Sequence, residues 1–395
     1  MGGEGHGKGK LRVAVVFGGR SGEHEVSLVS AASVMRALDK GRYEVYPVGI
    51  TRGGRWLTAG DPMLTLQSGQ GEAASLPAQA GTPAPPAQAG MPELPAQAGV
   101  PGPLAGRELV PGTREAGFPE VDVVFPVLHG TYGEDGTIQG LLEMADMAYV
   151  GAGVLGSALG MDKIAMKDVF VARGLPVVDY VALSAREWRA DPARWAAAIE
   201  GRLGYPCFVK PANLGSSVGI SKAHNREELV RGLDEAAVYD RRLVVEQGID
   251  AREIEVSVLG NDEPEASLPG EVVPCNEFYD YAAKYLDGES QLLIPAPLSE
   301  EQTRAVRELA VRAFQALDCA GMARADFLLC RRTGRLYISE LNTIPGFTSI
   351  SMYPKLWEAS GLPYPRLIDR LIELAIERHE ERRRLRSEYP GARSG

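Results

Sequence analysis

The stretch RADFLLCRRTGRLYISELN (residues 324–342) carries the strongest local signal in this sequence. Two β-prone runs flank a short connection that ends in Gly334. A hairpin loop of three residues with glycine last is a common turn, because that position requires a left-handed backbone. We therefore predict an antiparallel hairpin with the loop 332–334, in which Arg331 faces Arg335.

This pairing places four polar side chains on one face of the hairpin, because side chains alternate along a strand. Asp326 lies opposite Glu340, and Arg324 lies opposite Asn342. Two carboxylates and an amide oxygen suit Mg²⁺, with phosphate oxygens and water completing the octahedron. The neighbouring guanidinium suits developing negative charge. An exposed, salt-bridged hairpin face has the same pattern, and a register error of one residue would separate the four side chains.

The residues before this hairpin alternate between strand and helix patterns. The run LRVAVVFGG (11–19) predicts a buried strand, 29–38 a helix and 43–50 a second strand. This order is typical of an α/β domain with a parallel sheet. From about 68 to 116 the chain is rich in Pro, Ala, Gly and Gln, and PAQAG occurs three times. Such a segment has little apolar surface to bury, so we predict a mobile surface insertion and not a solenoid repeat.

The rest of the chain continues the alternation and contains helix-start signals. Asn225 has the position of a helix N-cap, and Ser299 with Gln302 has the pattern of a capping box. Further helices are predicted over 157–173 and 192–203, and further strands over 205–211, 242–247 and 253–260.

The composition limits the classes of function. The chain has 395 residues, is 45% hydrophobic and carries a formal net charge of −10, so it is not a wholly disordered chain. Its acidity argues against a general binder of nucleic acid or anionic membranes. No apolar run approaches the ~18 residues of a membrane span, and the first residues lack the apolar core of a secretory signal. The four cysteines form no CxxC pair, so we expect buried thiols in a reducing cytosol.

Two loops have the composition of ligand-binding segments. Lys210 ends a strand before the loop NLGSSVGIS (213–221), whose backbone N–H groups can surround phosphate oxygens. The loop is not a Walker A sequence, and a flexible surface hairpin has a similar composition. The segment GGRSGEHEVSL (18–28) lacks the GxGxxG of dinucleotide-binding loops. Its acidic pair, Glu23 and Glu25, either caps the helix that follows or holds a cationic group such as an amine.

Taken in order, these and other segments resemble the D-alanine–D-alanine ligases. The matching segments, within residues 11–57 and 119–378, are GGRSGEHEVSL, HGTYGEDGTIQG, MDK, FVKPANLGSSVGISK, EIEVSVLG, YDYAAKY, RADF and ELNTIPGFTS. The resemblance implies a mixed α/β (α+β) protein of ATP-grasp fold with three domains. These are an N-terminal Rossmann-like α/β domain over 11–151, a central ATP-grasp domain over 152–246 and a C-terminal ATP-grasp domain over 247–380, between a flexible tail at 1–10 and a charged tail at 381–395.

The resemblance also implies an activity, the ATP-dependent joining of two D-alanine molecules through a D-alanyl phosphate, for peptidoglycan precursor synthesis. Its implied cofactors are ATP and two Mg²⁺ ions, which Mn²⁺ can replace. A cytoplasmic homodimer without nucleic-acid or membrane partners is the implied state. A ligase that takes D-lactate or D-serine second is the nearest alternative, and Tyr285 favours D-alanine. An NAD-dependent oxidoreductase lacks its full fingerprint here, and the complete set of cations and metal ligands argues against a non-catalytic binder.

Finally, the resemblance assigns roles to residues of this sequence. The catalytic set is Glu25, which holds the first D-alanine ammonium, the loop residues Ser216 and Tyr285, and the oxyanion-stabilising Arg324. The ATP-binding set is Lys163, Lys210, Ser217, Glu246, Glu253 and Lys284. The substrate-binding set is Glu25, His129, Gly346, Ser351 and Met352, although a histidine beside glycines is more often a structural hydrogen-bonder. The metal set is Asp326, Glu340 and Asn342. Gln247 departs from the family pattern, where lysine is common near adenine, and Met352 replaces a commoner leucine.

Overall fold

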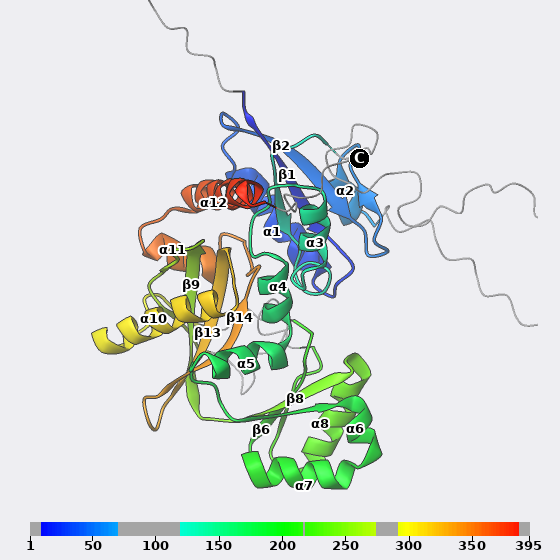
Figure 1. The fold of residues 1–395 in the computed structure, drawn as a ribbon, viewed down its shortest axis with the longest axis vertical. Coiled ribbons are helices and arrows are strands. Elements are labelled where there is room, and N and C mark those ends of the chain that lie inside the picture. The colour runs from blue at the N-terminus through cyan, green and yellow to red at the C-terminus, as the bar shows by residue number, and fades with distance from the viewer. Residues whose placement is uncertain (1–8, 70–118, 216–217, 274–290, 387–395) are drawn as a thin grey trace, which may run out of the picture.

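The computed structural model describes residues 9–69, 119–215, 218–273 and 291–386, which fold around three β-sheets (Figure 1). Several of the predicted features lie outside these described residues. They are most of the PAQAG insertion, Ser216, Ser217, Lys284 and Tyr285.

The N-terminal sheet confirms the predicted parallel α/β opening. Its order is β3-β2-β1-β4, and β1 pairs in parallel with both β2 and β4. The helix after β1 begins at His24 and not at Val29, so Glu23 becomes its N-cap residue and Glu25 lies in its first turn. The elements are β1 (Leu11–Gly18), α1 (His24–Ala37), β2 (Tyr43–Ile50), β3 (Trp56–Leu57), α2 (Pro62–Gln67), β4 (Val123–Val127) and α3 (Thr137–Met144).

The central sheet is antiparallel, with the order β5-β8-β6-β7. Apolar side chains from three helices pack against this sheet, and Trp188, Ile199 and Leu233 are examples. The predicted N-cap is confirmed, because the Asn225 side chain accepts a hydrogen bond from the N–H of Glu228. The elements are β5 (Tyr180–Ser184), α6 (Ala185–Ala190), α7 (Pro192–Leu203), β6 (Cys207–Pro211), β7 (Ser221–Ala223), α8 (Arg226–Tyr239) and β8 (Arg242–Gln247).

The C-terminal sheet has the order β12-β11-β9-β13-β14, with the short β10 paired to β9. Helix α10 starts with the predicted capping box, in which Ser299 and Gln302 each bond the other's backbone N–H. The elements are β9 (Ala251–Gly260), β10 (Glu265–Ala266), β11 (Gly270–Val273), β12 (Gln291–Leu293), α10 (Glu300–Ala316), β13 (Gly321–Cys330), β14 (Leu336–Asn342) and α11 (Met352–Ala359).

The β13–β14 hairpin confirms the predicted pairs of polar residues but reaches them differently. Asp326 lies opposite Glu340, and Arg324 opposite Asn342. At the turn, however, the N–H of Cys330 bonds the carbonyl of Arg335, so the predicted pairing of the two arginines that flank the loop is wrong. The loop is one residue longer than predicted, and a bulge between the turn and the polar pairs restores the register.

Three further helices complete the fold. The predicted helix 157–173 is two helices, α4 (Val154–Met161) and α5 (Lys163–Ala172), separated at Asp162, which caps α5. Helix α5 lies between the central and C-terminal sheets (Figure 1) and buries Met166 and Phe170 in the core of the latter. The long α12 (Tyr364–Arg384) instead packs in the core of the N-terminal domain. Both contacts cross the predicted domain boundaries, which remain a sequence-based division.

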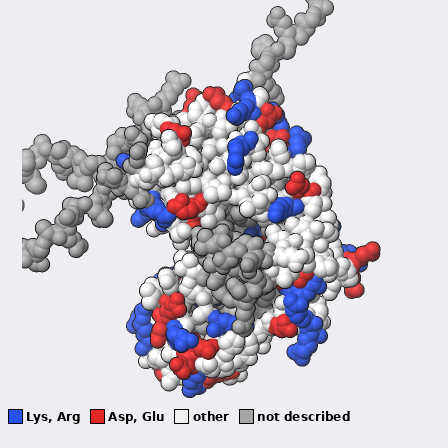
Figure 2. Space-filling model, turned by 180° about the vertical axis from the view of Figure 1, so that it is seen from behind, with Lys and Arg blue, Asp and Glu red and all other residues white. Residues whose placement is uncertain are grey.

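The surface is charged in both signs. On the face drawn in Figure 2, basic and acidic side chains of the described residues are interspersed. Within the part of the chain that the structure describes, no helix is long and apolar enough to span a bilayer.

Candidate active site

The polar face of the β13–β14 hairpin forms one wall of the site. Arg324 donates from Nε and Nη2 to the two carboxylate oxygens of Asp326, each at 2.7 Å. Asn342 Nδ2 donates to Asp326 Oδ2 at 3.0 Å. The sequence-based prediction that these side chains share one face is therefore confirmed, and Glu340 lies on the same face because it pairs with Asp326.

A further carboxylate on this wall comes from β9. Glu255 pairs with Asp326 in the sheet, and its Oε2 lies 2.9 Å from Nε of Arg324. Glu255 is not among the residues predicted from the sequence, whereas Glu253, two residues earlier on the same face of the strand, is. The alternation in EIEVSVLG contained the signal, because both glutamates follow the spacing of one strand face.

These carboxylates keep the guanidinium charged. Burial by itself would lower the pKa of Arg324, but the charges of Asp326 and Glu255 more than offset it and raise that pKa well above its ordinary value. Arg324 is therefore a fixed cation that can face developing negative charge without exchanging a proton.

The opposite wall holds two lysines around one buried glutamate. Glu246, at the end of β8, is 3% exposed. Its oxygens lie 2.9 Å from Nζ of Lys210 on β6 and 3.2 Å from Nζ of Lys167 on α5. Burial would raise the pKa of Glu246, but the two ammonium groups lower it below its ordinary value. The structure thus brings the predicted Lys210 and Glu246 together and adds Lys167, which sequence reasoning missed.

Lys163 and Glu253 also border this region. Lys163 begins α5, and its Nζ donates to the carbonyl of Leu214 at 2.6 Å, in the loop that follows Lys210. Burial works against the charged form of Lys210, but Glu246 and, to a lesser extent, Glu340 and Glu253 raise the pKa of its ammonium above the ordinary value. The lysines of β6 and α5 therefore lie near the carboxylates of the C-terminal sheet, and Lys167 Nζ contacts the Ser339 carbonyl, next to Glu340, at 3.2 Å.

The N-terminal domain contributes Glu23 and not Glu25. Glu25 projects from α1 to the surface, where it is 65% exposed and pairs with Arg52 at 2.7 Å. The carboxylate of Glu23 instead lies so close to Gly130 and Gly215 that a Cβ at either position would be 2.7 Å from its Oε2. Because the helix begins at His24, the residue before it turns inward and the residue after it faces solvent. The structure does not bring Glu25 to the site.

His129 is buried in a hydrogen-bonded network and links two domains. Its Nδ1 lies 3.0 Å from the carbonyl of Ile344, and its Nε2 lies 3.1 Å from Oγ of Ser30. A carbonyl can only accept, so Nδ1 carries the proton and Nε2 accepts from the hydroxyl. Burial lowers the pKa of His129, which agrees with a neutral ring. This histidine therefore orients the backbone that follows β14.

Glu134 binds the backbone N–H of Ile344, the residue whose carbonyl His129 binds. Its carboxylate accepts from the N–H of Gly130 at 2.6 Å and from the N–H of Ile344 at 3.2 Å. Burial, followed by the charge of Glu23, raises the pKa of Glu134 to about 8. Together, His129 and Glu134 fix the start of the segment 343–351, which carries the predicted second-substrate residues.

Those residues lie at the start of α11. Ser351 is the N-cap position of this helix, and its Oγ accepts from the N–H of Thr348 at 3.1 Å. A Cβ at Gly346 would lie 3.1 Å from the same Oγ, so the two predicted residues are neighbours. Met352 is buried beside Val272. The positive end of the helix dipole makes this position favourable for a carboxylate.

The residues predicted to bind metal have side chains of the kind that bind Mg²⁺. Among the described residues, no three His, Cys, Asp or Glu side chains converge as a metal site. Asp326, Glu340 and Asn342 supply two carboxylates and one amide, a set of hard oxygen donors that leaves positions for phosphate oxygens and water.

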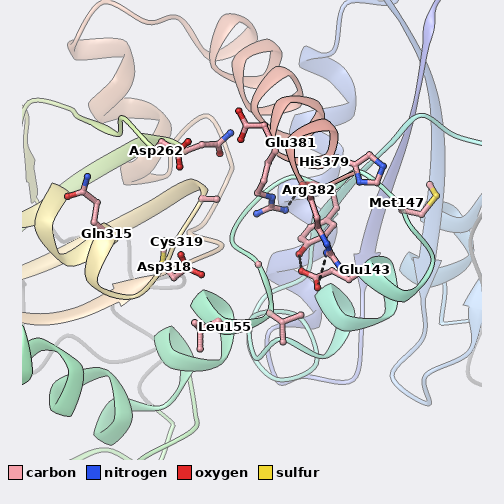
Figure 3. Close-up of a pocket in the computed structure, with 17 residues that line it drawn as sticks. Glu143, Met147, Leu155, Asp262, Gln315, Asp318, Cys319, His379, Glu381 and Arg382 are labelled. Carbon is pink, nitrogen blue, oxygen red and sulfur yellow. Dashed lines mark hydrogen bonds and ion pairs between the residues drawn. The ribbon is translucent and has the colours of Figure 1, made fainter. Parts of the chain in front are cut away.

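A separate cavity of about 550 Å³ lies among α3, α12 and the end of α10 (Figure 3). None of the predicted site residues lines it. Its arginines already have partners, since Arg382 pairs with Glu143 at 2.8 Å and Arg378 donates to the carbonyl of Tyr149 at 3.1 Å. We assign this cavity no part in the reaction.

Comparisons with known proteins give a consistent result. The chain matches two family models, described as D-ala D-ala ligase N-terminus over residues 12–152 and D-ala D-ala ligase C-terminus over residues 169–373. A D-alanine–D-alanine ligase of Thermoanaerobacter sp. (strain X514) is 55% identical over 374 residues, which are 94% of this chain and 98% of the relative. One from Ruminiclostridium cellulolyticum is 53% identical, over 95% of this chain and 98% of the relative.

Solved structures are similar over nearly the whole chain. The D-alanine-D-alanine ligase from Coxiella burnetii has a TM-score of 0.75 and 36% identity, and covers 95% of this chain and 98% of its own. VanG D-Ala:D-Ser ligase from Enterococcus faecalis has a TM-score of 0.75 and 33% identity, and covers 93% of this chain and 100% of its own.

Proposed function

The chain belongs to the D-alanine–D-alanine ligase family, and from that premise we propose how its residues carry out the reaction. It is an ATP-dependent ligase of mixed α/β, ATP-grasp architecture that joins two D-alanine molecules to D-alanyl-D-alanine. The relatives at 53–55% identity are D-alanine–D-alanine ligases, which supports D-alanine as the second substrate more than D-serine, the second substrate of a relative at 33% identity.

In the first step, the carboxylate of the first D-alanine attacks the γ-phosphorus of ATP. A new O–P bond forms while the bond to the β-phosphate oxygen breaks, which gives D-alanyl phosphate and ADP. Lys163 and Lys210 bind the phosphates as fixed cations, and the predicted Lys284 completes this set. Two Mg²⁺ ions held by Asp326, Glu340 and Asn342 would neutralise phosphate charge.

The first D-alanine needs a partner for its ammonium, and we transfer this role from Glu25 to Glu23. The support is the inward position of Glu23 beside Gly130 and Gly215. Glu25, which is 65% exposed and paired with Arg52, has no such position.

In the second step, the neutral amine of the second D-alanine attacks the acyl carbon. The C–N bond forms and a tetrahedral oxyanion develops. The C–O bond to phosphate then breaks as the oxyanion collapses, and the leaving phosphate takes the proton that the nitrogen loses. Arg324 and the N–H of Gly346 stabilise this oxyanion, while Ser351 and the N–H of Met352 hold the second carboxylate. The predicted loop residues Ser216 and Tyr285 exclude water, which would otherwise hydrolyse the acyl phosphate.

The observation that carries this proposal is the opposition of two walls of unlike charge. Lys210 on the central sheet shares Glu246 with Lys167, at 2.9 and 3.2 Å. Lys167 in turn donates to the carbonyl of Ser339, next to Glu340 on the C-terminal sheet, at 3.2 Å. An ATP phosphate chain with its metal ions fits between such walls, because the cations bind phosphate and the carboxylates bind metal. A cytoplasmic homodimer remains the proposed state, which light scattering on the purified protein tests.

The activity is tested by phosphate release from ATP and Mg²⁺ with D-alanine alone, and with D-alanine plus D-lactate or D-serine. Mass spectrometry identifies the products. The expected result is the D-alanine dipeptide in every mixture. A mixed product would change the substrate specificity assigned to the second subsite. Folded protein without D-alanine-dependent phosphate release would contradict the proposed function.

A further inference from the structure

Lys167 is a buried lysine that neither the sequence analysis nor the mechanism above uses. It lies on α5 four residues after Lys163, so both side chains project from the same face of the helix. Its side chain is 0% exposed. A buried ammonium is unfavourable unless it is paired and hydrogen-bonded. The groups that Lys167 contacts therefore indicate its role.

One partner is the backbone carbonyl of Ser339, which accepts from Nζ at 3.2 Å. Ser339 is the inserted residue of β14, between Ile338, which pairs with Phe327, and Glu340, which pairs with Asp326. A bulge leaves such a residue outside the ladder of hydrogen bonds. Lys167 therefore binds β14 where its register changes.

Helix α5 and the chain after it also cover the free edge of β14. This strand is the last of its sheet, so its outer backbone groups need partners other than a strand. The N–H of Leu341 lies 3.4 Å from Sδ of Met166, and the N–H of Ile338 donates to the carbonyl of Pro176 at 2.8 Å. Of these three contacts with the backbone of β14, the one from Lys167 involves a charged group.

The other partner is Glu246, whose second oxygen binds Lys210. Without Lys167, the carboxylate of Glu246 would be neutralised by Lys210 alone. It would then draw that ammonium toward itself and away from a phosphate. Because Lys167 also neutralises Glu246, Lys210 can interact with a bound phosphate as well as with Glu246.

We propose that Lys167 is a positioning residue of the nucleotide–metal site, which holds the β14 bulge in place and fixes Lys210 through Glu246. If the bulge were lost, Ser339 would lie opposite Asp326, and Glu340 would turn to the other face of the sheet. The proposal rests on the proposed function, because that function gives Lys210 and Glu340 their roles.

The test compares Lys167→Met and Lys167→Gln in the full chain, with Lys40→Met as the matched control on an exposed lysine. Mn²⁺ binding in the presence of ADP is measured by electron paramagnetic resonance, which needs no turnover, and the KM values for ATP and D-alanine follow. We expect Lys167→Met to weaken Mn²⁺–ADP binding about 10- to 100-fold, the usual effect of removing a residue that orients metal ligands. Glutamine can donate to the Ser339 carbonyl and recovers part of this affinity.

The ATP KM of Lys167→Met rises with the loss of Mn²⁺ affinity, while the D-alanine KM stays within about twofold, the range of neutral surface changes. Mn²⁺–ADP affinity within about twofold of the parent in a folded Lys167→Met protein would overturn the proposal. So would an equal loss of D-alanine affinity, which indicates a merely structural role. If circular dichroism shows Lys167→Met to be unfolded, the same Mn²⁺–ADP titration of Lys167→Gln tests the proposal instead. Failure of the parent to release phosphate would contradict the proposed function and leave the Mn²⁺ comparison interpretable.

Discussion

At the scale of single residues, the contrast between Glu23 and Glu25 follows from where α1 begins. Two glutamates that flank the first helical residue lie on different sides of the chain, because the helical turn rotates successive side chains by about 100°. One carboxylate then packs against glycines from two other loops, and the other reaches solvent. From the sequence pattern alone, either glutamate could be predicted to bind the ammonium of the first substrate.

This contrast gives the first prediction. Glu23→Gln removes the proposed charged hydrogen-bond partner of the substrate ammonium and should lower kcat/KM for D-alanine about 10- to 100-fold, as expected for a charge-assisted bond. Glu25→Gln is the matched control and should change kcat/KM little. The measurement is steady-state phosphate release at varied D-alanine. A larger loss in Glu25→Gln than in Glu23→Gln would return the role to Glu25.

Glu134 gives the second prediction, which concerns pH. Its native pKa of about 8 lies above the ordinary value of 4.5, mainly because it is buried. Between these two values the folded chain holds a proton that the unfolded chain has lost. The contribution of Glu134 to stability is therefore fully present below about pH 4.5 and is lost as pH rises through about 8.

Glu134→Gln removes this titration. The thermal unfolding midpoint of the variant should fall less than that of the parent between pH 5 and pH 8, within the window set by the two pKa values. Differential scanning calorimetry at a series of pH values measures the two curves. Glu25→Gln serves again as the control, and parallel curves for Glu134→Gln and the parent would contradict the prediction.

At the scale of elements, the β13–β14 hairpin shows two deviations that cancel. The loop holds one residue more than the simple turn requires, and the bulge at Ser339 absorbs it. The polar pairs predicted by counting from the turn are consequently right, while the pairing at the turn itself is wrong. Counting along a strand is reliable only where the ladder is regular, because one inserted residue reverses the faces of all those that follow.

Helix α5 gives the third prediction, because it presents both Lys163 and Lys167. Its N-cap Asp162 accepts from the N–H groups of Ile164 and Ala165, at 3.1 and 2.9 Å, and also pairs with Arg242. Loss of an N-cap costs about 0.5–2 kcal/mol. Asp162→Ala should lower the unfolding temperature and raise the KM for ATP.

Asp162→Ser keeps an acceptor for the helix N–H groups but loses the charge. It should therefore lie between the parent and Asp162→Ala in both unfolding temperature and ATP KM. Thermal unfolding and steady-state kinetics measure the series. Equal unfolding temperatures and equal ATP KM values for the two variants would show that the ion pair with Arg242, and not the cap, stabilises the start of α5.

At the scale of the whole molecule, the last helix closes the first domain. The apolar face of α12 packs with β1, β4 and α1, so the chain returns to the domain in which it began. The contact has a polar anchor in Asp369, which is 8% exposed, pairs with Arg42 and accepts from the Tyr43 hydroxyl at 2.8 Å. Burial and this carboxylate raise the pKa of Tyr43, so the hydroxyl stays a donor.

This anchor gives the fourth prediction. Asp369→Ala leaves the buried Tyr43 hydroxyl without its acceptor and removes one of the two carboxylates beside Arg42, the other being Glu373. It should destabilise the protein by about 1.5–3 kcal/mol, the usual range for a bond to a charged group. Thermal unfolding measures the loss, and Glu381→Ala at an exposed position of the same helix is the control. The kcat of the folded variant at low temperature should match that of the parent. An unfolding temperature equal to that of Glu381→Ala would contradict the role of the anchor.

The sequence by itself determined the features that depend on neighbours along the chain. The Asn225 cap, the Ser299–Gln302 box and the opening parallel strands follow from local hydrogen bonding and periodicity. The order of the motifs was enough to identify the family, because many short patterns in one order are far more specific than any one of them.

Only the tertiary structure decided which polar groups meet. The inward turn of Glu23, the carboxylate of Glu255 beside Arg324, and Lys167 between Ser339 and Glu246 join residues that are far apart in the chain. Periodicity states which face of an element is buried but not which element covers it. That choice depends on how the sheets pack and on which edge groups remain without a strand, and both are properties of the folded chain as a whole.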